Sequence, residues 1–185
     1  METRHLIWIG AGGAILPFFD FDDFDLVTLV EARSSAVERL RERFKNNDRV
    51  NIEEVVISDV SDENIFFNLK PEAFSQAGDI SNVRELFPNV AIKERSEITT
   101  TSLVSLLERI CFDSDRLTIV FDLPNANEKL IECALAQRAN YSIESFYVLN
   151  ASEGLSSGVD GGFKLVGRFE GDMCGNYLHF FRDPE

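Results

Sequence analysis

The sequence is short of basic residues and of long apolar runs, and each shortage argues against a class of protein. Among its 185 residues, 18 lysines and arginines stand against 32 aspartates and glutamates, which gives a net charge of −14. This acidic excess argues against a nucleic-acid partner, because proteins that bind nucleic acids contact the phosphates with basic side chains. It also argues against docking on anionic lipid. No apolar run reaches about 18 residues, so we expect no membrane span.

Cysteine and histidine are also scarce. The three cysteines, Cys111, Cys133 and Cys174, are odd in number and far apart, which favours reduced thiols in a cytoplasmic protein. The first residues lack the layout of a signal peptide, in keeping with that location. No Cys-x-x-Cys pair occurs, and only His5 and His179 could add nitrogen ligands, so no metal site is predicted. Both histidines are predicted to be structural.

Apolar and aromatic side chains are plentiful. Hydrophobic residues make up 44% of the chain, and 16 residues are phenylalanine. This is enough apolar material for a core without disulfides or metals, and the length suits one domain. We therefore expect a single domain over residues 1–185, with an irregular insertion over about 68–97 that holds Pro71, Gly78 and Pro88.

Apolar runs alternate with amphipathic segments along the chain. Strands are predicted at 6–9, 26–30, 50–57, 65–67, 117–121, 141–149, 163–169 and 177–181. Helices are predicted from Ser34 or Ser35 to Phe44, with either serine as the cap, near 83–87, at 103–110 and at 126–138. This order predicts an α/β fold with a mostly parallel sheet and a C-terminal antiparallel hairpin. It resembles the seven-stranded, Rossmann-like fold of S-adenosylmethionine-dependent methyltransferases.

A glycine-rich turn follows the first predicted strand, and an acid ends the second. Gly10, Ala11, Gly12 and Gly13 would let the backbone approach a ligand closely. Glu31 lies 18 residues after Gly13, near the spacing at which an acid binds ribose hydroxyls. Both features follow strands at their carboxyl ends, where open α/β sheets bind ligands. The alternative is a plain tight turn followed by a helix-initiating acid.

Neighbouring positions bear on the identity of the ligand. Ile15 stands where the dinucleotide motif requires a third glycine, which disfavours NAD. In the methyltransferase pattern the third glycine is replaced by Ala14, and Trp8 stands where an acid is common in the first strand. Asp59 follows the third strand, where this fold usually contacts adenine, although a plain turn residue is the alternative.

Several stretches resemble the FkbM family of methyltransferases. They are Leu-Val-Glu-Ala at 29–32, Val-Val-Ile-Ser-Asp at 55–59, the threonine-rich run and helix start at 99–107, and the strand ending in aspartate at 117–122. The resemblance implies methyl transfer from S-adenosylmethionine to a hydroxyl of a small molecule or a sugar. Asp122 is then the candidate catalytic residue that positions or deprotonates the acceptor.

The chain departs from the family pattern at other positions. Val104 replaces an aspartate at the helix start, and Pro124, Asn125 and Asn127 replace two acids and a glycine. Together with Trp8, these changes favour an alternative, in which a degenerate methyltransferase fold serves as a non-catalytic binding or scaffold subunit. Its acidic surface would suit a protein partner with a basic surface.

Overall fold

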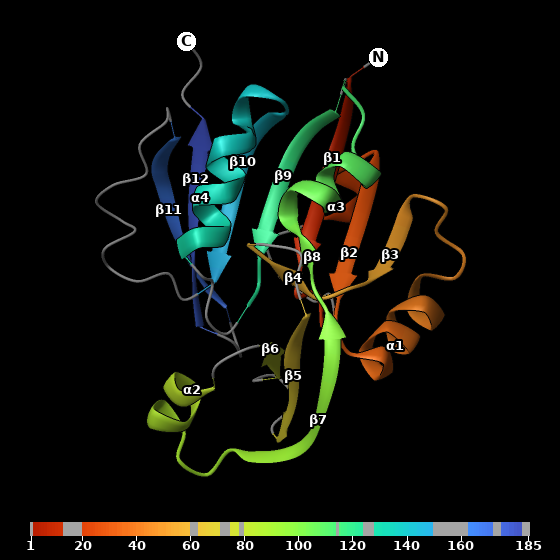
Figure 1. Cartoon of the computed structure of the whole chain (residues 1–185). Helices are drawn as coiled ribbons and strands as arrows, with labels where there is room; N and C mark the ends of the chain where they lie inside the picture. Colours follow the sequence, from red (N-terminus) through yellow and green to blue (C-terminus); the bar gives the residue numbers. More distant parts are fainter. Residues whose placement is uncertain are drawn as a thin grey trace.

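A seven-stranded sheet forms the centre of the computed structural model, which describes residues 2–12, 20–59, 63–70, 75–77, 80–113, 115–123, 128–149, 163–171 and 175–182. Its strand order is β11-β12-β10-β9-β1-β2-β3 (Figure 1). The strands are β1 (Thr3–Ile9), β2 (Leu26–Glu31), β3 (Val50–Glu54), β9 (Asp115–Phe121), β10 (Ser142–Leu149), β11 (Phe163–Gly171) and β12 (Gly175–Arg182). β12 pairs antiparallel with β10 and β11, and all other pairs are parallel, which confirms the predicted mostly parallel sheet with a C-terminal hairpin.

The strand β1 shows why this sheet is parallel at its centre. Leu6, Ile7, Trp8 and Ile9 are all at most 2% exposed, so apolar material covers both faces of the sheet. Ile7 and Ile9 belong to one core cluster, and Leu6 and Trp8 belong to a second cluster on the opposite face. A strand buried on both sides reads as an unbroken apolar run, as it does in the sequence.

Three helices cover the two faces. The first core cluster includes apolar residues of α3 (Leu103–Ile110) and α4 (Glu128–Ala136), which lie in front of the sheet in Figure 1. The helix α1 (Ser34–Phe44) contributes Leu40 to the second cluster. Within the described part of the chain, no helix combines the length and the apolar character needed to cross a membrane.

The start of α1 differs from the prediction. Its N-cap is Arg33, which makes no side-chain capping bond, and Ser34 and Ser35 lie inside the first turn. The predicted serine cap is therefore wrong. The reason is the preceding acid. The carboxylate of Glu31 accepts the backbone N–H groups of Ala32 and Arg33, and the helix therefore begins at Ser34 with Arg33 as its N-cap.

A second, smaller sheet occupies part of the region that was expected to be irregular. The strands β5 (Glu63–Lys70), β6 (Gln76–Ala77) and β7 (Ala91–Thr99) pair antiparallel in the order β6-β5-β7. The helix α2 (Ser81–Leu86) packs against it through Val83, which forms a small core with Leu69 and Val90. In Figure 1 this sheet extends beyond the carboxyl ends of the central parallel strands.

A short parallel pair links the two sheets. The strand predicted at 50–57 ends as β3 at Glu54, and β4 (Ile57–Ser58) pairs instead with β8 (Thr101–Ser102). The N–H of Val55 donates to the carbonyl of Glu31 at 3.2 Å, and the carbonyl of Val56 accepts from Thr101 at 2.8 Å. The chain thus changes partner between Val55 and Val56, which divides one predicted strand into two.

Candidate functional site

The glycine turn lies at the carboxyl ends of β1, β2 and β9, as the sequence predicts. Gly10 has a φ of +83°, and a Cβ at this position would lie 2.3 Å from the backbone oxygen of Asp122. The N–H of Asp122 in turn donates to the carbonyl of Ile9 at 2.8 Å. Gly10 is therefore required by the close approach of the chain after β9, whether or not a ligand binds.

Glu31 points from the end of β2 into this turn. Its side chain is 5% exposed, and Oε2 accepts the backbone N–H of Gly12 at 2.8 Å. Its other oxygen, Oε1, accepts the N–H groups of Ala32 at 3.0 Å and Arg33 at 2.9 Å. The acid and the glycine turn, which are 19 residues apart in the chain, are thus in direct contact.

The guanidinium of Arg33 covers the same carboxylate. Its Nε donates to Oε1 of Glu31 at 3.0 Å, and its Nη2 donates to Oε2 at 3.2 Å. Burial by itself would raise the pKa of Glu31, but the hydrogen bonds and charge of Arg33, with the N–H groups of Arg33 and Gly12, outweigh it and hold that pKa below its usual value of 4.5. Both carboxylate oxygens therefore have donors from the chain itself.

The backbone N–H groups of the turn are also bonded within the chain. Gly10 and Ala11 both donate to the carbonyl of Val30, at 2.9 and 3.0 Å. With the bond from Gly12 to Glu31, three successive N–H groups are directed at β2. Gly13 lies outside the described residues.

Trp8 is part of the core rather than of an open pocket. Its side chain is 1% exposed and meets the ring of Phe21 edge-on, with centroids 6.3 Å apart. The indole Nε1 donates to Oδ2 of Asp122 at 3.2 Å, so Trp8 holds one oxygen of the predicted catalytic carboxylate. The sequence did not predict this contact, although strands were predicted at both 6–9 and 117–121.

Asp59 follows β4 and makes different contacts. Its Oδ1 accepts the hydroxyl of Ser58 at 3.0 Å, and its Oδ2 lies 3.7 Å from Nζ of Lys129 on α4. The structure therefore brings Gly10, Gly12, Glu31 and Asp122 together through direct contacts, whereas Asp59 faces α4.

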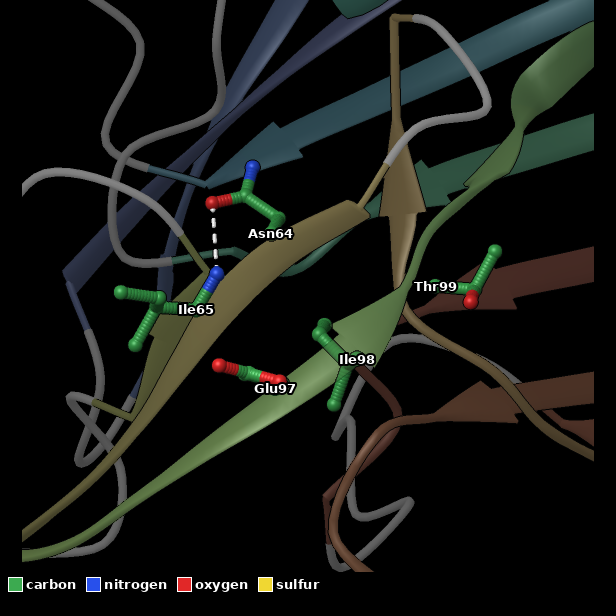
Figure 2. Close-up of a pocket in the computed structure, with 5 residues that line it drawn as sticks. All are labelled: Asn64, Ile65, Glu97, Ile98 and Thr99. Carbon is green, nitrogen blue, oxygen red and sulfur yellow. Dashed lines mark hydrogen bonds between the residues drawn. The ribbon is translucent and has the colours of Figure 1, made fainter.

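A pocket of about 320 Å³ lies where the small sheet joins the central one. It is lined by Asn64 and Ile65 of β5 and by Glu97, Ile98 and Thr99 of β7 (Figure 2). The carboxamide oxygen of Asn64 accepts the N–H of Ile65 at 2.8 Å. The sequence predicts a strand at 65–67, which includes Ile65, but it does not predict the pocket, because the two strands pair across a separation of more than thirty positions.

The chain matches no family model and no curated protein. It does resemble solved structures. YhhF, a presumed methyltransferase of Escherichia coli, superposes with a TM-score of 0.52 and 11% identity over 100% of this chain and 80% of its own. A conserved hypothetical protein of Streptococcus pyogenes superposes with a TM-score of 0.55 and 8% identity, over 99% of this chain and 88% of its own. A presumed tRNA methyltransferase of Streptococcus pneumoniae superposes with a TM-score of 0.50 and 11% identity, over 100% of this chain and 66% of its own.

Identities of this size establish the fold alone. The specific resemblance to the FkbM family stays a prediction, because no family model matches. The strand order and these neighbours together show that the chain has the Rossmann-like fold of S-adenosylmethionine-dependent methyltransferases.

Proposed function

We propose that this protein transfers a methyl group from S-adenosylmethionine to a hydroxyl of a small molecule or a sugar. The observation that carries the proposal is the position of Glu31. It is a buried acid at the carboxyl end of β2, hydrogen-bonded to the glycine turn after β1, in a sheet of methyltransferase strand order. Acids at this position of an α/β sheet accept hydrogen bonds from ribose hydroxyls.

The contacts of Glu31 fit the nucleoside half of the cofactor best. Two side-chain donors from Arg33 contact Glu31, and two ribose hydroxyls could replace them at the same oxygens. Asp59, at the end of the next strand, is assigned to adenine. Gly10, Ala11, Gly12 and Gly13 are assigned to the methionine end, which they would meet through the absence of large side chains, since the N–H groups of Gly10 and Ala11 are bonded to Val30.

Asp122 is assigned to the acceptor. The cofactor supplies an activated methyl group on sulfur, and the chain has to align an acceptor oxygen with it and receive the hydroxyl proton. Trp8 fixes one oxygen of Asp122 at 3.2 Å, which makes Trp8 a positioning residue for this carboxylate. One neighbour is named for tRNA, but a net charge of −14 argues against a polyanionic acceptor here and favours a small molecule or a sugar.

A second function, a non-catalytic binding subunit, is favoured by a different observation. The chain itself satisfies Glu31 with Arg33 and the backbone, and Asp122 with Trp8. A fold that has lost its cofactor would be expected to close its site in this way. A protein with a basic surface is then the expected partner.

Calorimetric titration of the whole chain with S-adenosylmethionine and S-adenosylhomocysteine, with NAD in parallel, separates these functions. Methyl transfer predicts micromolar binding of a sulfur ligand and no binding of NAD. Glu31→Gln should weaken that binding about tenfold or more, because the ribose loses a charged acceptor. Glu54→Gln is the matched control, since Glu54 is the register partner of Glu31 on β3 and is more exposed.

The alternative outcomes are distinct. Equal weakening by both substitutions would refute the assignment of Glu31. No binding of any ligand by folded protein would overturn the methyltransferase proposal and make the binding subunit the leading function. If the cofactor binds, Asp122→Asn should leave its affinity unchanged and reduce turnover once an acceptor is found.

A further inference from the structure

A cluster of three metal-ligating side chains lies at the amino ends of the parallel strands, away from the glycine turn. His5 belongs to β1, Asp115 begins β9, and Cys111 caps the C-terminus of α3. One ligand atom of each residue lies within 4.8 Å of those of the other two. The three residues come from different elements, and the parallel pairing of β1 with β9 brings them together.

The interior of this cluster has an unfilled bonding position. His5 and Asp115 are 0% and 2% exposed. Nδ1 of His5 lies 3.2 Å from Oδ2 of Asp115, and the same Oδ2 accepts the N–H of Phe112 at 3.0 Å. The second oxygen, Oδ1, is buried and has no hydrogen-bond partner among the described residues. Buried carboxylate oxygens are rarely left without a donor or a cation, because the desolvation cost is high.

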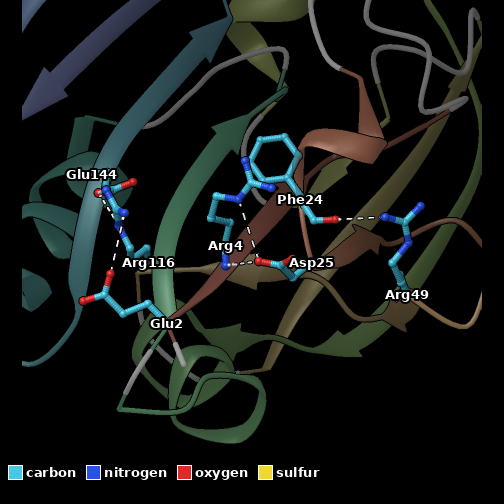
Figure 3. A network of polar contacts seen from close by, with 7 residues as sticks. All are labelled: Glu2, Arg4, Phe24, Asp25, Arg49, Arg116 and Glu144. Atoms are coloured by element: carbon cyan, nitrogen blue, oxygen red, sulfur yellow. Dashed lines mark hydrogen bonds and ion pairs between the residues drawn. The ribbon is translucent and has the colours of Figure 1, made fainter.

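The arginines adjacent to His5 and Asp115 in the chain pair with other acids. Arg4 precedes His5 and pairs with Asp25, whose Oδ2 lies 3.7 Å from its Nε (Figure 3). Arg116 follows Asp115 and donates through Nε to Oε1 of Glu144 at 2.6 Å. Both arginines are thus engaged with acids near the surface.

The arrangement does not suit a nucleophilic thiol. A histidine that activated Cys111 would have to direct a free nitrogen at it, but Nε2 of His5 lies 2.8 Å from Oγ1 of Thr28, and Nδ1 faces Asp115.

We propose that His5, Cys111 and Asp115 bind a zinc ion, with a solvent molecule as the fourth ligand. Imidazole, thiolate and carboxylate are the ligands that Zn²⁺ takes in proteins. The three side chains bring their ligand atoms within 4.8 Å of one another, and Oδ1 of Asp115 is the carboxylate oxygen that has no partner among the described residues. On binding, sulfur forms a bond to zinc and the thiol proton leaves to solvent.

The surroundings support this site. Thr28 would hold the second nitrogen of His5, as outer partners of metal-bound histidines do. Cys111 is half-buried and provides the approach from solvent, where the exposed acids Glu108 and Asp113 add negative charge that attracts a cation. Zinc would link the end of α3 to two central strands.

The test is zinc binding by the whole chain after removal of metals with a chelator. Wild-type protein should bind one Zn²⁺ per chain in competition with a chromogenic chelator, and Co²⁺ should give the charge-transfer absorption of a thiolate ligand. Cys111→Ser should lose that band and weaken binding by at least roughly 100-fold, more than outer-shell losses usually cost. Cys133→Ser is the matched control, because Cys133 is also a half-buried free thiol against the same core cluster.

Every outcome bears on the proposal. Absence of stoichiometric binding overturns it, as does equal weakening by the two serine variants. Binding by wild type that Cys111→Ser abolishes, and that Asp115→Asn also abolishes with an unchanged circular dichroism spectrum, supports it. Because Asp115→Asn keeps the shape of the side chain, it serves as the second variant if Cys111→Ser fails to fold.

Discussion

The two ends of the parallel strands each bury a carboxylate, and they treat it differently. At the carboxyl ends, Glu31 has donors at both oxygens, from Arg33 and from the backbone. At the amino ends, Asp115 has the backbone N–H of Phe112 and His5 at one oxygen, and at the other it has no partner within the described part of the chain. Burial of an acid therefore does not by itself indicate a ligand. The bonding positions that the chain leaves unfilled are more informative.

The largest effect on stability should come from removing Arg33, the cation that pairs with Glu31 at the carboxyl ends of the strands. Arg33→Met leaves the buried charge of Glu31 without its partner and should cost about 3–5 kcal/mol of the free energy of unfolding near neutral pH. Urea denaturation measures this. Arg41→Met is the control, since its pair with Glu54 is exposed and should be worth about 1 kcal/mol or less.

The same variant carries a pH signature. Because the pKa of Glu31 is lower in the folded chain than its usual 4.5, the stabilisation is present above that pH and is lost as the pH falls through the folded value. The difference between wild type and Arg33→Met should therefore shrink below a pH of about 4.5. A constant difference across that range would contradict the role given to Arg33.

A smaller but still large loss is expected at the turn. Gly10→Ala adds a Cβ that would meet the backbone of Asp122 and forces an L residue into a φ of +83°. We expect a cost of roughly 2–4 kcal/mol from strain and overpacking. Gly12→Ala should cost about 1 kcal/mol, because its nearest neighbour is the side chain of Arg33 at an ordinary 3.5 Å. Equal losses would show that close packing at Gly10 is relieved by movement.

The contact between Trp8 and Asp122 should be worth less. Trp8→Phe removes one hydrogen bond to a carboxylate while keeping an aromatic ring in the core, and we expect a loss of about 1–2 kcal/mol. Thermal denaturation of this variant, of Asp122→Ala and of the double variant checks this. If each single variant costs as much as the double, the two side chains act through their mutual bond; strictly additive losses would refute that coupling.

The smallest effect on stability is expected at the amino ends of the strands, at Asp115. With a chelator present, Asp115→Asn should change the free energy of unfolding by less than about 1 kcal/mol, because asparagine keeps an oxygen for Phe112 and gives up one that has no partner. With zinc added, wild type alone should gain stability. A loss of several kcal/mol in the chelator would remove the contrast between the two ends.

The central sheet could be predicted because its signal is local. The apolar runs at 6–9, 26–30 and 117–121 need no knowledge of their partners to be read as buried strands. Of the small sheet, only the strand at 65–67 was predicted, and it lies within β5; β7 was missed because it buries few side chains and its pairing with β5 is remote in sequence. The end of β3 was missed for a similar reason, since Val56 continues an apolar pattern while its carbonyl changes partner.

The candidate site divides in the same way. Gly10, Gly12 and Glu31 were predicted to lie at the carboxyl ends of strands, where open α/β sheets bind ligands, but the direct contact of Glu31 with Gly12 was not predicted. The contact of Arg33 with Glu31 depends on side-chain direction, which no spacing encodes. The pairing of His5 with Asp115 spans 110 positions and requires the register of β1 on β9.

The packing around Gly10 has a consequence for how such proteins are traced through evolution. Selection for a stable fold alone would retain this glycine, because the carbonyl of Asp122 leaves no space for a methyl group. A lineage that had stopped using its cofactor would keep the residue unchanged. In a search for active relatives, this glycine therefore indicates common ancestry only. Substitutions at the neighbouring strand ends indicate whether activity has been kept or lost.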